Sequence, residues 1–166
     1  MVTALREFGE EGPEDPQLIA TGTQGGAREM RRAKGRHGLA EDDALAGGRT
    51  FDDVITGCSG YPDIGFVRFE PMKIHQAPYR AIVHEKMDGL LVAGRCVSAT
   101  HVAASAGKSM GNCLAMGHAA GLAAALSVQR GPLPRHLPAV EWQQALRQDG
   151  VDLARGGEEE DPNMPA

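Results

Sequence analysis

Residues 110–129 limit the possible folds of this chain more than any other segment. Their sequence, MGNCLAMGHAAGLAAALSVQ, consists almost entirely of Ala, Leu, Gly and Met, and Gly131-Pro132 follows directly. This length and ending predict one helix over 110–129. A helix that is apolar on all sides lies inside a core or a membrane. Because aromatic residues make up only 4% of the chain, we expect a core of small aliphatic side chains with closely packed backbones.

A membrane span is the alternative interpretation of this helix. Gly117 and Gly121 form a GxxxG pair, which is typical of helices that associate in membranes. Four polar residues interrupt the run: Asn112, His118, Ser127 and Gln129. Ala is also a weaker insertion signal than Leu or Ile. We therefore predict a buried helix of a soluble protein, in which the two glycines let a neighbouring backbone approach closely.

The remaining pattern predicts short elements. They are a helix over 39–48 with an acidic first turn, a strand or turn over 49–55, strands over 79–85 and 88–94, a loop over 95–109 and a helix over 139–150. The segment 88–94, DGLLVAG, is a continuous apolar run and is predicted to be a strand buried on both faces. In the last helix we expect Val140, Trp142 and Leu146 to face inward.

Charge and cysteine content exclude several classes of protein. The net charge is −5 at pH 7, and the acidic residues concentrate in 1–16 and 151–166. The middle is only mildly basic, which argues against nucleic-acid binding. Three cysteines, Cys58, Cys96 and Cys113, show neither a CxxC pair nor a zinc pattern. We expect them to be reduced and mostly buried. No signal-like segment opens the sequence, so we predict a cytoplasmic protein.

The predicted strand end at Ala93-Gly94 and the helix start near residue 110 define a candidate ligand site. Ligands of open α/β sheets bind beyond the carboxyl ends of strands. A helix N-terminus offers free N–H groups and a positive dipole end. Small residues begin the helix, and Arg95 and Lys108 flank the gap. An anionic ligand would suit this place; tight packing alone is the competing explanation.

Two strings carry a resemblance to a known family. PYRAIVHEKMDGLLVAGRCVSATH and MGNCLAMGHAAGLAAAL resemble the carboxyl-terminal end of FAD-dependent oxidoreductases related to the flavoprotein A subunit of heterodisulfide reductase. The upstream segment AREMRRAKGRHGLAEDDALAGGRTFDDVI is similar to the same family. The resemblance covers 27–153. It implies an α/β fold, an incomplete C-terminal portion of an FAD/NAD(P)-binding fold, with short β-strands followed by a long buried Ala/Gly-rich helix.

The resemblance also implies cofactor contacts. Gly94-Arg95 would lie against the FAD phosphates and ribityl chain, and the helix start against the flavin ring, which performs hydride or electron transfer. The implied cofactor-binding residues are Gly94, Arg95, Lys108, Met110, Gly111, Asn112, Cys113 and Gly117. The chain departs from the family where Gly111 and Asn112 replace Pro and Thr, and where Lys108 replaces Arg.

The G-x-G-x-x-G unit that binds the FAD pyrophosphate in this family has no counterpart in the sequence. We therefore expect a piece of an FAD-dependent oxidoreductase that is inactive alone and acts on an unidentified small molecule. The alternative is a non-catalytic remnant or interaction subunit that pairs with a separate FAD-binding chain or with itself. Some full-length relatives carry a 4Fe-4S cluster, but no cluster ligand motif occurs here. The expected domains are a poorly ordered or divergent segment 1–26, the oxidoreductase part 27–153 and a disordered acidic tail 154–166.

Three residues are weak candidates for catalysis. His101 follows the predicted strand and could donate a proton, because its ordinary pKa lies near neutrality. Tyr79 and Arg80 could line the active-site cavity. For each of the three, a purely structural role is the competing interpretation.

Overall fold

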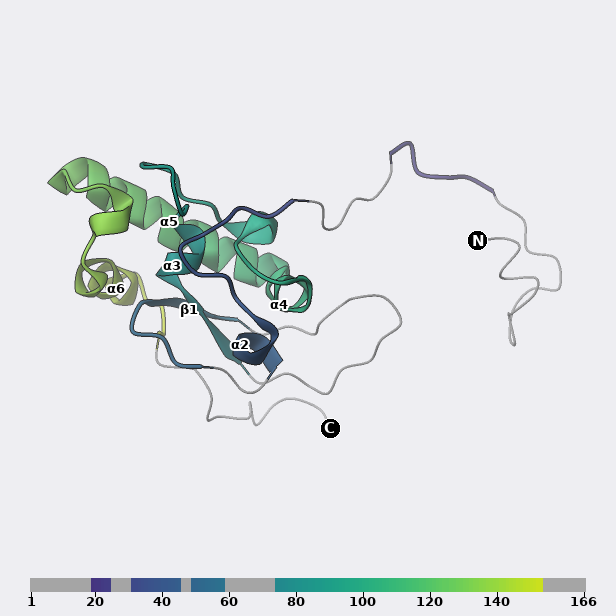
Figure 1. Cartoon of the computed structure of the whole chain (residues 1–166), viewed down its shortest axis with the longest axis horizontal. Helices are drawn as coiled ribbons and strands as arrows, with labels where there is room; N and C mark the ends of the chain where they lie inside the picture. The colour runs from purple at the N-terminus through teal and green to yellow at the C-terminus, as the bar shows by residue number, and fades with distance from the viewer. Residues whose placement is uncertain (1–18, 25–30, 46–48, 59–73, 154–166) are drawn as a thin grey trace. The chain divides into compact units, whose positions relative to one another are not determined.

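Ser109 and Gly131 delimit α5 (Met110–Arg130), the longest helix in the described part of the chain (Figure 1). The Ser109 hydroxyl accepts a hydrogen bond from the amide of Asn112, the usual N-cap arrangement. Gly131 has a φ of 95° and its amide donates to the Ser127 carbonyl, which ends the helix. The predicted helix over 110–129 is confirmed.

Only one side of α5 is covered. Its buried residues are Asn112, Met116, Ala119, Ala123 and Leu126, whereas Met110, Leu114 and Val128 are exposed. By length and hydropathy alone α5 would suffice to span a membrane, and 28% of its most apolar window is buried. The expectation of a helix buried on all sides is therefore wrong.

The predicted close approach at the two glycines of α5 is also wrong. A Cβ added at Gly117 or Gly121 would meet no atom within 4 Å. Close backbone packing occurs instead at Gly35, where an added Cβ would lie 2.6 Å from the Ala81 carbonyl oxygen and 2.8 Å from Ser98 Cβ.

The structure is a computed structural model that describes residues 19–24, 31–45, 49–58 and 74–153. The chain divides into two units, 1–30 and 31–166. In the first unit, 19–24 contain neither helix nor strand. All elements discussed below belong to the second unit. Apart from 19–24, the expected N-terminal segment 1–26 lies outside the described residues, as does the whole tail 154–166.

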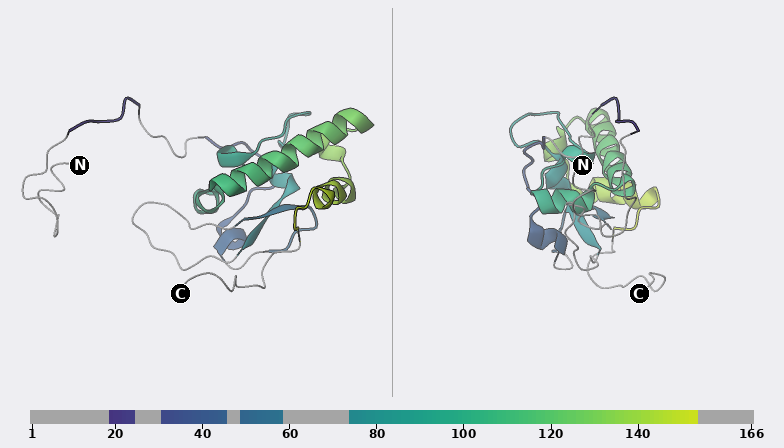
Figure 2. Two further views of the ribbon diagram at one scale, coloured as in Figure 1. Left: turned by 180° about the vertical axis from the view of Figure 1, so that it is seen from behind. Right: turned by 90° about the vertical axis from the view of Figure 1, so that its right-hand side faces the viewer.

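The second unit contains a two-stranded antiparallel sheet, β1 (Val54–Cys58) and β2 (His75–Pro78). β1 is rich in β-branched residues, which suit a buried strand. α5 packs across β1, and α6 (Ala139–Gln148) packs against both (Figure 2). This is a mixed α/β arrangement with a small sheet. The buried core includes Ile55, Ala81, Ile82, Val83, Met116, Ala119, Ala123, Leu126, Trp142 and Leu146.

The strand predicted over 79–85 begins too late. The extended residues are those of β2, and the chain then turns into α3 (Tyr79–Ile82). Asp53 causes the change, because its carbonyl accepts from the Tyr79 amide at 2.6 Å and its carboxylate from the Arg80 amide at 2.9 Å. These bonds satisfy the free amides of a first helical turn.

The predicted buried strand over 88–94 is wrong as well. Leu91 forms one isolated antiparallel bridge with Val83, and residues 90–94 are only half-buried. A strand buried on both faces requires strand neighbours on both sides, and the described chain supplies one bridge. Gly94, with a φ of 80°, then leads into the 3₁₀ turn η1 (Gly94–Cys96).

Three further helical segments complete the unit. α4 (His101–Gly107) lies in the predicted loop, and Thr100 caps it by accepting from the Ala103 amide. α2 (Glu41–Leu45) has the predicted acidic first turn but begins two residues later than predicted. The 3₁₀ turn η2 (Pro134–His136) links α5 to α6.

The prediction for α6 is confirmed in position and mostly in orientation. Trp142 and Leu146 are each 1% exposed. They are four residues apart and therefore share one helix face. Val140 is 66% exposed, so its predicted inward orientation is wrong. Two residues of separation turn Val140 away from the face that Trp142 occupies.

Candidate functional site

Seven of the eight predicted cofactor residues lie in η1 or where α4 ends and α5 begins. α4 stops at Lys108, Ser109 caps α5, and η1 contacts the first part of α5. We call Gly94, Arg95, Lys108, Met110, Gly111, Asn112 and Cys113 the α5 N-terminal site. Figure 2 shows α4 beside the starting end of α5. The sequence prediction that these segments lie together is therefore consistent with the fold, although no strand end contributes.

Free backbone amides are the main chemical feature of the α5 N-terminal site. The first bond within the helix runs from the Cys113 amide to the Ser109 carbonyl at 3.0 Å. The amides of Met110 and Gly111 precede it and have no acceptor inside the helix. Both residues are exposed, and a Cβ added at Gly111 would meet no atom within 4 Å. An anion or an electron-rich ring can approach this end of the helix.

Asn112 and Cys113 point back into the protein. The buried Asn112 side chain donates from Nδ2 to the Ala106 carbonyl at 3.3 Å, which joins α4 to α5. The Cys113 thiol lies 3.6 Å from the Lys108 carbonyl oxygen. A Cβ added at Gly94 would lie 3.8 Å from Cys113 Sγ, so these two residues are close. The side chains of Asn112 and Cys113 therefore support the junction, and only their backbone belongs to its open side.

Gly117 lies apart from the other predicted cofactor residues. It is exposed on the side of α5, about two turns beyond the helix start. His101 opens α4 and is exposed, so the whole of α4 separates it from Met110.

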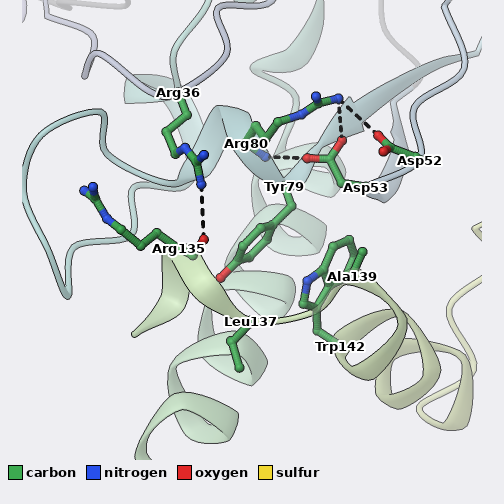
Figure 3. A pocket seen from close by; sticks show the side chains of 9 residues that line it. All are labelled: Arg36, Asp52, Asp53, Tyr79, Arg80, Arg135, Leu137, Ala139 and Trp142. Atoms are coloured by element: carbon green, nitrogen blue, oxygen red, sulfur yellow. Dashed lines mark hydrogen bonds and ion pairs between the residues drawn. The ribbon is translucent and has the colours of Figure 1, made fainter. Parts of the chain in front are cut away.

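Tyr79 and Arg80 line a different place, a pocket of about 150 Å³ near the end of α5 (Figure 3). The lining residues are Arg36, Asp52, Asp53, Tyr79, Arg80, Arg135, Leu137, Ala139 and Trp142. They come from α3, α6, η2 and the segments before β1 and α2. Tyr79 and Arg80 do line a cavity, but their predicted place in an active-site cavity stays a prediction. We call it the arginine pocket.

Aromatic contacts fix one wall of the arginine pocket. The Tyr79 ring stacks on Trp142 with centroids 4.9 Å apart and planes 23° apart. The Tyr79 hydroxyl donates to the Pro134 carbonyl at 2.9 Å. Burial raises the pKa of Tyr79, so the phenol stays protonated at neutral pH. Neither a phenolate base nor a free hydroxyl donor is available here.

Internal partners occupy the guanidinium groups of the arginine pocket. Arg80 pairs with Asp52 at 3.2 Å and Asp53 at 3.0 Å. Arg135 pairs with Asp88 at 2.7 Å and donates to the carbonyls of His84, Glu85 and Met87. Arg36 donates to the Arg135 carbonyl at 3.1 Å. A ligand anion would have to compete with these contacts. We therefore interpret the arginine pocket as a structural contact between segments of the chain.

No sequence signal predicted the arginine pocket as a whole. Trp142 is 63 positions from Tyr79, and nothing local in either segment indicates that the rings stack. Its buried indole nitrogen has no hydrogen-bond partner in the described part of the chain. In Figure 3 this nitrogen lies on the side of the indole nearer to Tyr79.

The three cysteines are free, as predicted. Only Cys58 is buried, whereas Cys113 is half-buried and Cys96 is exposed, so the expectation of mostly buried thiols is wrong. Burial, with a smaller contribution from Cys113, raises the pKa of Cys58 to about 12. Among the described residues, no group of three or more His, Cys, Asp or Glu side chains is arranged to hold a metal ion.

Comparison with known proteins gives one match. The sequence model of the family described as FAD dependent oxidoreductase matches residues 1–146. No curated protein and no solved structure matches the chain. The matched region includes η1, α4, the whole of α5 and most of α6.

Proposed function

The chain belongs to the FAD-dependent oxidoreductase family, and from this premise we propose that it supplies the flavin-facing helix end of a redox site. The α5 N-terminal site is the part of the described chain that suits this role. One observation carries the proposal: the exposed Met110 and Gly111 amides begin a helix of 21 residues beside Gly94.

The residues present fit a flavin at this position. Gly111 leaves open space beside the first turn, which a planar ring requires. Gly94 adopts a φ of 80°, so the chain turns there without a side chain. Arg95 is exposed in η1, and Lys108 is half-buried at the end of α4, so both add positive charge nearby. The inward Asn112 keeps the two helices together and leaves the amides accessible.

The chain's residues would act by electrostatics and orientation. A bound flavin supplies hydride or electron transfer. The positive end of the α5 dipole favours negative charge close to Met110 and Gly111. The positive charges of Lys108 and Arg95 also favour negative charge at this position. Ser109 and Asn112 hold the first turn in place, because their hydrogen bonds fix its amides relative to α4.

The proton donor stays a prediction. His101 lies at the other end of α4 from Met110. The Tyr79 hydroxyl already donates to Pro134, and Arg80 is paired with two carboxylates. We therefore propose no catalytic residue from the arginine pocket, and we keep His101 as a candidate.

The proposed relation to one subfamily rests on two segments of the sequence. LLVAGRC and GHAAGLAAAL support a relation to the flavoprotein A subunit of heterodisulfide reductase. We propose that a separate FAD-binding polypeptide provides the pyrophosphate contacts and that the substrate is a small molecule. Three free thiols agree with a reducing compartment such as the cytoplasm. A non-catalytic subunit that pairs with an FAD-binding chain is the second candidate, favoured by the single bridge that the described part of the chain gives to 88–94.

Amide chemical shifts of the isotope-labelled chain test the proposal during titration with FAD up to millimolar concentration. We expect saturable shifts at Met110, Gly111 and Gly94, with an affinity weaker than that of a complete flavoenzyme. The indole N–H of Trp142 marks the arginine pocket. No shifts at the α5 N-terminal site, or shifts centred on Trp142, would overturn the proposal.

A charge substitution sharpens the same titration. Gly111→Glu places a carboxylate where a flavin would gain negative charge, so we expect at least a fivefold loss of FAD affinity. The helix itself should not suffer, because acidic residues are favourable in a first turn. Gln144→Glu on the exposed side of α6 adds the same charge elsewhere and should leave the affinity unchanged.

A further inference from the structure

The uncovered side of α5 has a regular pattern. Met110, Leu114, Gly117, Gly121, Ala124 and Val128 are all exposed, and we call them the outward stripe. They follow one another at spacings of four, three, four, three and four residues. At 100° per residue, this spacing keeps all six on one side of the helix, within an arc of about 80°. Met110 is 80% exposed, Leu114 74% and Val128 87%.

The outward stripe carries no charge and no polar side chain. The opposite side of α5 already packs into the core through Met116, Ala119 and Ala123. α5 is therefore apolar on two sides, of which the described chain covers one. Large exposed apolar side chains in a row mark an interaction surface.

The spacing indicates what kind of element fits there. Alternation of three and four residues is the heptad pattern, in which the seam of one helix meets the seam of another. The two glycines in the middle have no atom within 4 Å of an added Cβ, so a second backbone can approach there. A helix crossing at a shallow angle of about 20° matches such a seam.

We propose that the outward stripe binds the outward stripe of a second copy of this chain, antiparallel, about a twofold axis near Ala119. Reversal of the stripe about this point places Met110 opposite Val128 of the second copy and Leu114 opposite Ala124. Gly117 then faces Gly121. Each larger side chain meets a smaller or branched one, and the closest contact is between glycines. A self-matching patch is what a twofold interface requires.

The charges around the stripe agree with this pairing. His118 flanks the stripe and is held by Asp149 at 2.9 Å, away from the seam. Lys108 comes near the C-terminal end of the second α5, where the helix dipole is negative. Arg130 at that end is already paired with Glu141. Antiparallel helices also place opposite dipole ends together.

The pairing covers the side of the α5 N-terminal site at Met110 and Lys108 but leaves the end of the helix open. Helix amides point along the axis, whereas the second helix would lie at the side. The inference therefore does not depend on FAD binding. A helix of 21 residues is about 31 Å long, and one such pair is small compared with stable interfaces. We expect a dimer whose fraction rises with protein concentration.

Sedimentation of the full chain between about 1 µM and 1 mM tests the association. We expect a shift from monomer to dimer within this range. Leu114→Lys should keep the chain monomeric, because it places two charges in the apolar seam. Val140→Lys is the matched control on α6, since Val140 is exposed but lies off the stripe. Far-UV circular dichroism checks that both variants remain folded.

Disulfide trapping tests the direction of the pairing, in a background of Cys96→Ser and Cys113→Ser. A mixture of Leu114→Cys and Ala124→Cys chains should form a cross-linked dimer, and each variant alone should not. In each variant alone, the two cysteines would be ten residues apart along the seam, about 15 Å, which is too far for a disulfide. A monomer at all concentrations, a dimer that Leu114→Lys leaves intact, or cross-linking of either variant alone would overturn the proposal.

Discussion

The polar groups near the two ends of α5 differ in whether they already have hydrogen-bond or ion-pair partners. At the C-terminal end, the Tyr79 hydroxyl, Arg80 and Arg135 each have partners inside the chain. At the N-terminal end, the amides of Met110 and Gly111 have no acceptor within the helix. The arginine pocket has more charge, but its arginines are already paired within the chain, whereas the two amides of the α5 N-terminal site have no acceptor within the helix.

This difference shows that a cluster of cations is not by itself an anion site. Arg135 donates to three carbonyls and pairs with Asp88, so it joins η2 to the segment after α3. Removing such a contact leaves a polar group unsatisfied, which costs more than the contact itself contributes. Groups without a partner inside their own helix, such as the Gly111 amide, can bind a ligand with no such loss.

Truncation of the aromatic wall should give the largest effect. Trp142→Ala removes a fully buried ring that stacks on Tyr79. We expect the free energy of unfolding to fall by about 3–5 kcal/mol, measured by urea denaturation with far-UV circular dichroism. Val140→Ala, on the exposed side of the same helix, should change it by less than about 0.5 kcal/mol. Equal effects would contradict the structural role of the arginine pocket.

Lowering the pH should reduce the stability of the fold through His75, which is buried in β2. Burial lowers the pKa of His75 from 6.5 to about 4, against the opposing effect of Asp43. Below pH 6.5 the unfolded chain takes up a proton that the folded chain does not. The free energy of unfolding should therefore be fully retained above pH 6.5 and decrease by about 3 kcal/mol as the pH approaches 4.

The pH dependence of denaturation in two variants checks this assignment. His75→Gln should flatten the slope between pH 6.5 and 4, whatever its effect on stability at neutral pH. His136→Gln changes an exposed side chain in η2 and should keep the slope. An unchanged slope in His75→Gln would show that another group titrates.

A smaller effect should follow from Gly94→Ala at the α5 N-terminal site. Its φ of 80° is unfavourable for alanine, so we expect a loss of about 1–2 kcal/mol. Gly107→Ala is the matched change in α4, where an added Cβ meets no atom within 4 Å. That variant should be neutral or more stable by up to about 1 kcal/mol. Thermal denaturation should show a lower melting temperature for Gly94→Ala and an unchanged or higher one for Gly107→Ala.

Thiol labelling should distinguish the cysteines without any change in stability. The exposed Cys96 should react quickly with a disulfide reagent in the folded chain. Cys58 should react about a thousandfold more slowly than an ordinary thiol, because burial raises its pKa from 9.0 to about 12. Mass spectrometry of the labelled peptides at increasing times gives the order. Fast labelling of Cys58 would mean that the end of β1 is open.

The sequence predicted the elements whose determinants are local. α5 carries its own N-cap in Ser109 and its own terminator in Gly131, so its bounds followed from the residues alone. The acidic first turn of α2 is a signal of the same kind. The segments 79–85 and 88–94 depended on distant partners: Asp53 for the first, and for the second strand neighbours that the described residues supply only through one bridge.

The candidate site divides along the same line. The closeness of Gly94 to Cys113 agrees with the expected juxtaposition, whereas Gly117 lies apart from the other predicted cofactor residues. The helical period of 3.6 residues already places Gly117 about two turns after the start of the helix. The same period, applied to residues 110–128, predicts the outward stripe. The stacking of Tyr79 on Trp142 brings together distant segments, so no local pattern could indicate it.

Trp142 gives the chain a built-in optical probe. It is the one tryptophan of the sequence, and it lines the arginine pocket, not the α5 N-terminal site. Because indole emission overlaps flavin absorption, a flavin bound at Gly111 would shorten the excited-state lifetime of Trp142 by energy transfer. Donor lifetime would then report how far away the ligand binds, with no label attached.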